Sequence, residues 1–364
     1  MRLRLAALTR NGLERARAVK AAFPGAELWV GERQRAAAPE AQGVFPKVAD
    51  FAALGWDACD GLVFFLSLGA VVRTIAPLLR SKETDPAVVC VDDAGRFAVS
   101  VLSGHVGGAN DLALRVAEIL GAQAVVTTAS DALGTVAVDI LGRELGWRVE
   151  DKGAVTAASA AVVNGLPVAV VQECGESLWW KGPGPLPGNL KVFASLSEAR
   201  EAGDFEAWLL VSDRATKELK AELGGRWQRT VLYRPRTLCL GMGCDAGADP
   251  EEAHGLALQG LAEAGLSPDC VAVLASIDLK AGEEALLETA RRLGAETRFF
   301  DRDQLNAAGV VSPANPMVEK YTGAVGVCEP AAMLAAGTTT LLLTKRKSRR
   351  ATLAVARREF PTGA

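Results

Sequence analysis

Short apolar runs alternate with helix-length amphipathic segments along almost the whole sequence, and this alternation constrains the fold more than any other feature. Apolar runs of strand length occupy residues 3–8, 61–66 and 271–274, and segments with helical spacing of apolar residues follow them. Continuous apolar strands are typical of parallel sheets, because helices cover both faces of such sheets. The pattern therefore predicts an α/β fold with parallel or mixed sheets flanked by helices.

The chain has 364 residues, more than one hydrophobic core usually organises, so we expect a multi-domain protein. The signals predict an amino-terminal α/β domain at 1–136, a middle α/β domain or linker at 137–235 and a carboxy-terminal α/β domain at 236–364. Four tryptophans of the middle segment are expected in a core or a domain interface: Trp179, Trp180, Trp208 and Trp227.

Composition excludes several classes of function. A net charge of −3 and an aromatic content of 5% argue against a nucleic-acid partner. The 7 cysteines include no CxxC pair and predict free thiols in a reducing compartment. The longest apolar stretch falls short of the roughly 20 residues that span a membrane, so we expect a cytoplasmic protein. With 2 histidines far apart in sequence, no protein-built metal site is expected.

Residues 103–110 read Ser-Gly-His-Val-Gly-Gly-Ala-Asn and lie between a predicted strand and a predicted helix. The glycines allow close approach of the backbone to a ligand, and the helix offers unpaired N–H groups. His105 can exchange a proton near neutral pH, and Asn110 or Asp111 is expected to cap the helix. We interpret this loop as a ligand site. The alternative is a tight turn with a structurally bonded histidine.

Doubly wound sheets bind ligands in the loops beyond the carboxyl ends of their strands, so polar loops at these positions are further candidate sites. Ser67 and Gly69 are placed to hold an anionic group, with Arg73 one helical turn further on; otherwise Arg73 is a solvated helix residue. Before the predicted strand at 97–101, a strand at 88–91 is followed by Asp-Asp-Ala-Gly, which predicts a hairpin turn.

In the carboxy-terminal part, residues 275–280 read Ala-Ser-Ile-Asp-Leu-Lys after a buried strand. An extended backbone would point Ser276, Asp278 and Lys280 to one side, as a carboxylate-binding trio or as an ordinary surface ion pair.

Residues 241–247 are expected to form a glycine-rich loop after a strand at 238–240. The loop lacks the last glycine of a dinucleotide motif, so a nicotinamide site is not expected. Cys244 is interpreted as a buried thiol rather than a nucleophile.

Taken in order, these blocks resemble the cobalt-precorrin-5A hydrolase (CbiG) family of cobalamin biosynthesis. The resemblance covers residues 73–79, 84–92, 102–110, 241–244, 274–280, 299–300, 305–306, 328–332, 345–347 and 351–357. Two positions depart from the family pattern. Leu68 stands where members often have Thr, and Asp245 stands where they often have Arg, which removes one candidate anchor for a carboxylate.

The resemblance implies opening of a δ-lactone on a cobalt-containing tetrapyrrole, with release of acetaldehyde. The cobalt arrives inside the substrate, so neither a cofactor nor a metal of the protein's own is expected. The substrate's acetate and propionate groups would meet local positive charges. Candidates are Arg73, Arg115, Lys280 and the basic run at 345–350, although such a run is also typical of a solvated surface.

For catalysis, we expect His105 to act as general base on the attacking water or as acid toward the departing oxygen. Ser103 and the amides of Gly107 and Gly108 are expected to stabilise the oxyanion, and Asp278 is the second candidate base. The resemblance implies substrate contacts from Ser67, Gly69, Arg73, Gly107, Gly108, Asn110, Gly243, Cys244, Ser276, Lys280, Asn306 and Glu329.

Two other functions fit parts of the pattern. A non-catalytic corrinoid carrier would use the same carboxylate-binding loops without a titrating group, and neighbouring corrin-pathway enzymes would be its partners. A nucleotide-dependent α/β enzyme is disfavoured by the broken glycine motifs.

Overall fold

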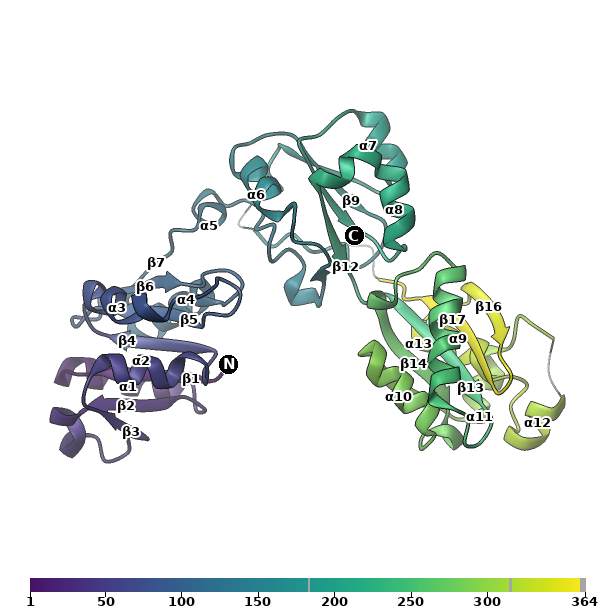
Figure 1. Cartoon of the computed structure of the whole chain (residues 1–364), viewed down its shortest axis with the longest axis horizontal. Helices are drawn as coiled ribbons and strands as arrows, with labels where there is room; N and C mark the ends of the chain where they lie inside the picture. The colour runs from purple at the N-terminus through teal and green to yellow at the C-terminus, as the bar shows by residue number, and fades with distance from the viewer. Residues whose placement is uncertain (183, 314–315, 361–364) are drawn as a thin grey trace. The chain divides into compact units, whose positions relative to one another are not determined.

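The protein is described from a computed structural model that covers residues 1–182, 184–313 and 316–360. The chain forms three sheets and divides into two compact units, Met1–Ile140 and Leu141–Ala364. Helices flank each sheet (Figure 1), and each sheet contains at least one antiparallel pair. The predicted multi-domain α/β class is confirmed.

The amino-terminal sheet has seven strands in the order β3-β2-β1-β4-β5-β6-β7. Its strands are β1 (Leu3–Ala7), β2 (Glu27–Gly31), β3 (Gly43–Phe45), β4 (Gly61–Phe65), β5 (Ala87–Val91), β6 (Phe97–Leu102) and β7 (Gln123–Val125). Its helices are α1 (Arg10–Ala22), α2 (Val48–Trp56), α3 (Leu68–Ile75), α4 (Ala109–Leu120) and α5 (Ala129–Leu133). Apolar residues of α1 and α4 pack on one face of the sheet, and those of α2 and α3 pack on the other.

Strand β6 reverses direction within this sheet. The predicted hairpin forms, so that Leu102 lies opposite Val88 and Ala98 lies opposite Val91. The loop after β6 therefore leaves the sheet at the edge where β1, β4 and β5 begin, whereas Ser67 follows the carboxyl end of β4. The two predicted ligand loops at 67–73 and 103–110 consequently lie at opposite edges of one sheet. Only the first lies beyond the carboxyl ends of the main parallel strands.

The middle sheet has the order β10-β9-β11-β12-β8. It consists of β8 (Arg148–Val149), β9 (Val168–Gln172), β10 (Leu190–Phe193), β11 (Ala207–Val211) and β12 (Thr230–Arg234), with helices α6 (Val155–Val163), α7 (Leu196–Ala202) and α8 (Thr216–Leu223). Trp208 is fully buried in the core of this sheet, edge-on to Phe205, and Trp227 packs against the same cluster. The predicted core role of these two tryptophans is confirmed.

The carboxy-terminal sheet has the order β15-β14-β13-β17-β16. Its strands are β13 (Leu238–Cys244), β14 (Val271–Ile277), β15 (Glu296–Phe300), β16 (Leu341–Lys347) and β17 (Ala351–Arg357). Its helices are α9 (Pro250–Glu263), α10 (Glu284–Leu293), α11 (Arg302–Ala308), α12 (Pro316–Thr322) and α13 (Cys328–Ala336). Helices α9 and α10 pack on one face, and α11 and α13 pack on the other.

Two predicted loops of this domain begin later than expected. Residues 241–244 continue strand β13 and residues 275–277 continue strand β14. Gly241 is needed for packing, because a Cβ there would lie 1.8 Å from the carbonyl oxygen of Cys328 in α13. The glycines at the start of the predicted loop therefore bring a helix close to a strand.

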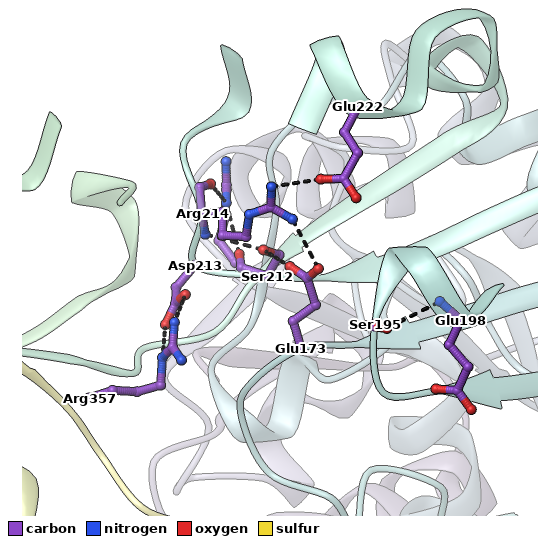
Figure 2. A network of polar contacts seen from close by, with 9 residues as sticks. Glu173, Ser195, Glu198, Ser212, Asp213, Arg214, Glu222 and Arg357 are labelled. Atoms are coloured by element: carbon purple, nitrogen blue, oxygen red, sulfur yellow. Dashed lines mark hydrogen bonds and ion pairs between the residues drawn. The ribbon is translucent and has the colours of Figure 1, made fainter. Parts of the chain in front are cut away.

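Polar contacts join the middle and carboxy-terminal sheets within the second unit (Figure 2). Asp213, which follows β11, accepts hydrogen bonds from Arg357 at 2.7 and 2.6 Å and from the Thr237 hydroxyl at 2.7 Å. The neighbouring Arg214 donates to Glu173 at 3.2 Å and to Glu222 at 2.7 Å. Asp213 is 1% exposed, so the hydrogen bonds from Arg357 and Thr237 replace the water that would otherwise stabilise its carboxylate.

Candidate functional site

His105 lies in the loop that joins β6 to α4, and two backbone positions fix the shape of this loop. Ser103 has a φ of 57°, and Gly108, the N-cap of α4, has a φ of 84°. A positive φ is costly for a residue with a side chain, so the strain at Ser103 is held by surrounding contacts. The hydroxyl of Ser103 donates to the carbonyl of Asp85 at 2.9 Å, and this bond anchors the loop to the segment before β5.

Two carboxylates flank the His105 ring. Nδ1 lies 3.1 Å from Asp139, and Nε2 lies 2.7 Å from Asp131, the third residue of α5. The Ser130 hydroxyl also lies 3.1 Å from Nε2. The His105 side chain is 17% exposed, and Asp131 is the more exposed of the two carboxylates at 45%. Both ring nitrogens therefore face oxygen atoms.

The electrostatics of this cluster favour an imidazolium. The hydrogen bond with Asp139 raises the pKa of His105 most, burial opposes the rise, and Asp131 adds to it, so that the pKa reaches about 9. Burial alone would raise the pKa values of Asp131 and Asp139, but their hydrogen bonds hold both pKa values below the usual range. Near pH 7 His105 is therefore a proton donor. The general-base role is disfavoured in this state, because the ring already holds its second proton.

Asn110 belongs to this cluster but does not cap the helix, so the capping prediction is wrong. It is 4% exposed, accepts a hydrogen bond from Ser100 at 2.7 Å and donates to Thr128 at 2.8 Å and Asp131 at 3.0 Å. The N-cap of α4 is Gly108, and no side chain caps this end. Asn110 instead orients the carboxylate that faces His105.

The predicted oxyanion donors are engaged in the loop itself. The N–H of Gly108 donates to the carbonyl of His105 at 3.0 Å, and the Ser103 hydroxyl is bonded to Asp85. Gly107 packs on Ser103, since a Cβ at Gly107 would lie 2.4 Å from that of Ser103. These positions shape the loop, and the geometry does not favour the expected oxyanion role for Ser103 or Gly108.

Sequence reasoning missed Ser130, Asp131 and Asp139. These residues follow β7, which pairs in parallel with β6, so both loops leave the same end of neighbouring strands. A search of the segment after the next strand for acidic and hydroxyl side chains would have found the first two. Asp139 lies beyond α5, and nothing in the local pattern marks it.

The Ser67 loop lies apart from this cluster, at the other edge of the sheet. Ser67 is the exposed N-cap of α3 and makes no side-chain capping bond, and Gly69 is exposed. Arg73 donates to the carbonyl of Gly69 at 3.2 Å within the same helix. Leu68, the departure from the family pattern, is 44% exposed. This loop and the His105 cluster therefore do not form one site within the sheet.

The carboxy-terminal domain contains a pocket of about 490 Å³ between the ends of β13 and β16 and helix α12. Three predicted substrate contacts line it: Gly243, Cys244 and Lys280. Four more cations contribute to its wall, together with Asp245: Lys345, Lys347, Arg349 and Arg350. The volume falls in the range of small-molecule sites, roughly 300–1,000 Å³.

Internal pairs neutralise part of this charge. Lys280 lies 2.9 Å from Glu283, and Arg350 lies 3.7 Å from Asp245. The Arg350 guanidinium also donates to the carbonyls of Ala246 and Gly247 and so holds the turn after β13. Burial raises the pKa of the Cys244 thiol to about 11, so Cys244 is protonated near pH 7 and is no thiolate nucleophile.

Four predicted residues lie outside the pocket lining. Ser276 is buried and donates to the carbonyl of Met242 at 2.7 Å. Asp278 is exposed in a 3-10 turn (Asp278–Lys280), so the extended backbone expected for this trio is wrong beyond Ile277. Asn306 bonds to the backbone of residues 323 and 325.

Glu329 is the fourth of these residues. It is 2% exposed and accepts hydrogen bonds from the backbone N–H groups of Val311, Ser312 and Lys345. Burial alone would raise the pKa of Glu329, but these bonds hold it below its usual range. Ser276 and Glu329 thus support the domain from inside, whereas Asn306 is exposed and holds the backbone at residues 323 and 325.

No helix in the described ranges is both long and apolar enough to cross a bilayer. Across residues 1–182, 184–313 and 316–360, no group of three or more His, Cys, Asp or Glu side chains is arranged to hold a metal ion.

Three parts of the chain match protein families. Residues 50–131 match Cobalamin synthesis G N-terminal, residues 136–235 match Cobalamin biosynthesis central region, and residues 238–356 match Cobalamin synthesis G C-terminus. A cobalt-precorrin-5A hydrolase from Priestia megaterium is 46% identical over 83% of this chain and 79% of its own length. Another from Salmonella typhimurium is 30% identical over 75% of each chain.

Among solved structures, a cobalamin biosynthesis protein G homolog from Sulfolobus solfataricus aligns over 98% of this chain and 97% of its own. Its identity is 20% and the TM-score is 0.37. The three family matches in order and the two relatives together show that this chain belongs to the cobalamin synthesis G (CbiG) family.

Proposed function

We propose that this chain is a cobalt-precorrin-5A hydrolase, which opens the δ-lactone of that corrin-pathway intermediate and releases acetaldehyde. The observation that carries this proposal is the 46% identity to a relative of that name over 83% of the chain. Cobalt enters as part of the substrate, and we propose that the protein adds no cofactor of its own and acts in the cytoplasm.

The geometry suits His105 to the acid side of this reaction. When water attacks the lactone carbonyl and the acyl–oxygen bond breaks, the departing alkoxide takes a proton. A His105 imidazolium with a pKa of about 9 is charged at neutral pH and can supply that proton. Asp139 acts as a positioning residue, because its bond to Nδ1 directs Nε2 toward Asp131 and the more open side.

Asp131 is our candidate for the basic side. Its carboxylate is the more exposed of the pair and is held by Thr128, Asn110 and His105. In this proposal, Asp131 accepts the proton of the attacking water while His105 protonates the leaving oxygen. The neutral His105 then takes the proton back from the freed hydroxyl, the C–C bond breaks with its electron pair passing into the conjugated macrocycle, and acetaldehyde departs. Asp131 returns the proton it took from water to the solvent, which restores the starting state.

The test is anaerobic incubation of the purified protein with its cobalt-precorrin lactone, with acetaldehyde trapped as it forms. We expect protein-dependent acetaldehyde together with the mass of the opened lactone, and neither product in a sample without protein. Binding of the lactone without either product would instead favour the corrinoid carrier, and the catalytic roles of His105 and Asp131 would be withdrawn.

A further inference from the structure

We propose that the pocket of the carboxy-terminal domain binds the peripheral carboxylates of a tetrapyrrole along one edge, with Lys345 and Lys347 of β16 as its main anchors. The inference rests on the proposed function, because it gives the substrate of that reaction a place in the fold. It concerns binding alone, and it can be tested with a ligand that contains no lactone.

The positively charged side chains of the pocket differ in whether an acidic side chain already pairs with them. Lys280 and Arg350 have acidic neighbours, Glu283 and Asp245. Within the described part of the chain, neither Lys345 nor Lys347 has an ion-pair partner, and both line the pocket. Cations without acidic partners near a concave surface attract anionic ligands, and carboxylates are their ordinary partners in proteins.

Arg349 adds a third such charge. It lines the pocket, it is exposed, and no acidic side chain pairs with it among residues 1–182, 184–313 and 316–360. A single anion would satisfy one of these cations, whereas a ligand with several carboxylates along one edge would engage them together. The spacing of several cations around one hollow therefore favours a polycarboxylate.

The pocket also has an apolar side. Met317 and Tyr321 lie one helical turn apart on α12 and line the pocket, although they are 61% and 73% exposed. Exposed large apolar side chains beside a hollow are typical of a binding surface. A macrocycle whose flat face rests on Tyr321 and whose acidic edge reaches β16 would use both kinds of surface.

Neighbouring side chains of β16 have different roles, one in lining the pocket and the other in stabilising the domain. Arg346, between the two lysines, points to the other side of the strand and pairs with Glu263 of α9 at 2.8 Å. Arg346 does not appear in the pocket wall. It therefore offers a matched control, because its substitution removes a positive charge from the same strand without changing the pocket.

The first experiment titrates the full-length protein with uroporphyrin, a porphyrin with carboxylates on every pyrrole ring, and follows porphyrin fluorescence. We expect the double variant Lys345→Gln/Lys347→Gln to bind about tenfold more weakly, since charge-assisted hydrogen bonds contribute on that scale. Tyr321→Ala should weaken binding about threefold to tenfold. Arg346→Gln should bind as the unaltered protein does.

Salt gives a second readout. Raising the ionic strength should weaken binding by the unaltered protein more than binding by the double variant, because the variant has lost the charges that salt screens. Absence of uroporphyrin binding by the unaltered protein, or equal affinity in the double variant, would overturn the proposal. Circular dichroism and thermal unfolding would establish that each variant is folded.

Turnover separates this inference from the proposed function. In the acetaldehyde assay, the double variant should raise KM while kcat is retained, because the lysines bind the ring edge and do not touch the lactone. A fall in kcat with unchanged KM would contradict the assigned role. If no acetaldehyde forms with any variant, the hydrolase proposal fails, and the uroporphyrin titration still decides the pocket.

Discussion

Asp213 and Arg357 lie 144 residues apart in sequence and meet through two hydrogen bonds of 2.7 and 2.6 Å. The carboxylate is almost completely buried, while Arg357 is the last residue of β17. Asp213 follows β11 in the middle sheet, so the pair joins two sheets that have separate cores. The unpaired charge of Asp213 would be costly at this buried position.

Arg357→Gln should therefore destabilise the second unit. Removing the guanidinium leaves the buried Asp213 carboxylate with fewer donors, and the expected loss in the free energy of unfolding is about 3 kcal/mol. Denaturant unfolding monitored by tryptophan fluorescence measures it. Arg346→Gln removes an exposed pair with Glu263 and should change the same quantity by no more than about 1 kcal/mol. Equal losses in the two variants would contradict the special weight given to Asp213.

Gly241→Ala should also lower stability. The new Cβ would fall 1.8 Å from the Cys328 carbonyl oxygen, so α13 must move away from β13, at an expected cost of about 3 kcal/mol. Gly255→Ala is the matched control, because a Cβ at this position on α9 meets nothing within 4 Å. Alanine there should stabilise the helix by up to about 1 kcal/mol. A Gly241→Ala protein with unchanged thermal unfolding would refute the packing argument.

His105→Gln should reduce kcat in the acetaldehyde assay by about 100-fold or more, since general acid catalysis contributes roughly 10²–10⁴-fold. Glutamine keeps hydrogen-bonding capacity but cannot donate a proton to an alkoxide. His254→Gln provides the control, because His254 lies on α9 and takes part in neither the His105 cluster nor the pocket lining. Full turnover by His105→Gln would remove His105 from the mechanism.

The titration of His105 gives a prediction that is independent of turnover. Its pKa of about 9 lies above the ordinary value of 6.5, so the folded state binds the proton more tightly than the unfolded chain. The resulting stabilisation is complete below pH 6.5 and is lost as pH rises through about 9. NMR titration should therefore show a His105 signal that changes near pH 9, and kcat should fall above that pH if His105 supplies the proton.

Asp139→Asn should move that transition to lower pH. The hydrogen bond with Asp139 is the largest cause of the raised pKa, and an amide carries no charge to favour the imidazolium. As a positioning residue, Asp139 should also affect the pH profile of kcat, whereas a purely structural role would change stability alone. An unaltered His105 titration in Asp139→Asn would show that Asp131 alone sets the pKa.

The sequence contained most of the fold, because continuous apolar strands and amphipathic helices are local patterns. The sequence also predicts the hairpin between β5 and β6, whose turn ends at Gly95 with a φ of 67°. The consequence of that hairpin was missed: reversing β6 moves the His105 loop to the opposite edge from Ser67. The end of the sheet at which a loop lies depends on the direction of every strand between that loop and the other one. A short sequence motif contains no information about these directions.

The candidate site was only half accessible from sequence. His105 is one of only 2 histidines in the sequence and is therefore an obvious candidate. Its carboxylate partners lie 26 and 34 residues away in sequence, on segments with weak patterns. Gly241 looked like part of a ligand loop, because tight packing and close ligand approach both require glycine. The basic run at 345–350 could not be divided into pocket-facing and supporting residues before the strand β16 was known.

The placement of neighbouring β16 side chains on opposite sides of the strand makes this protein sensitive to insertions and deletions near β16. At the end of β16, whose register shifts between Leu343 and Arg346, Lys345 and Lys347 line the pocket and Arg346 lies on the other side of the strand. Losing a single residue from the preceding turn, with the strand slipping to compensate, would exchange the two assignments at once. Side chains that bind the ligand and a side chain that stabilises the domain thus alternate at this end of the strand, and the register of the strand keeps them on opposite sides.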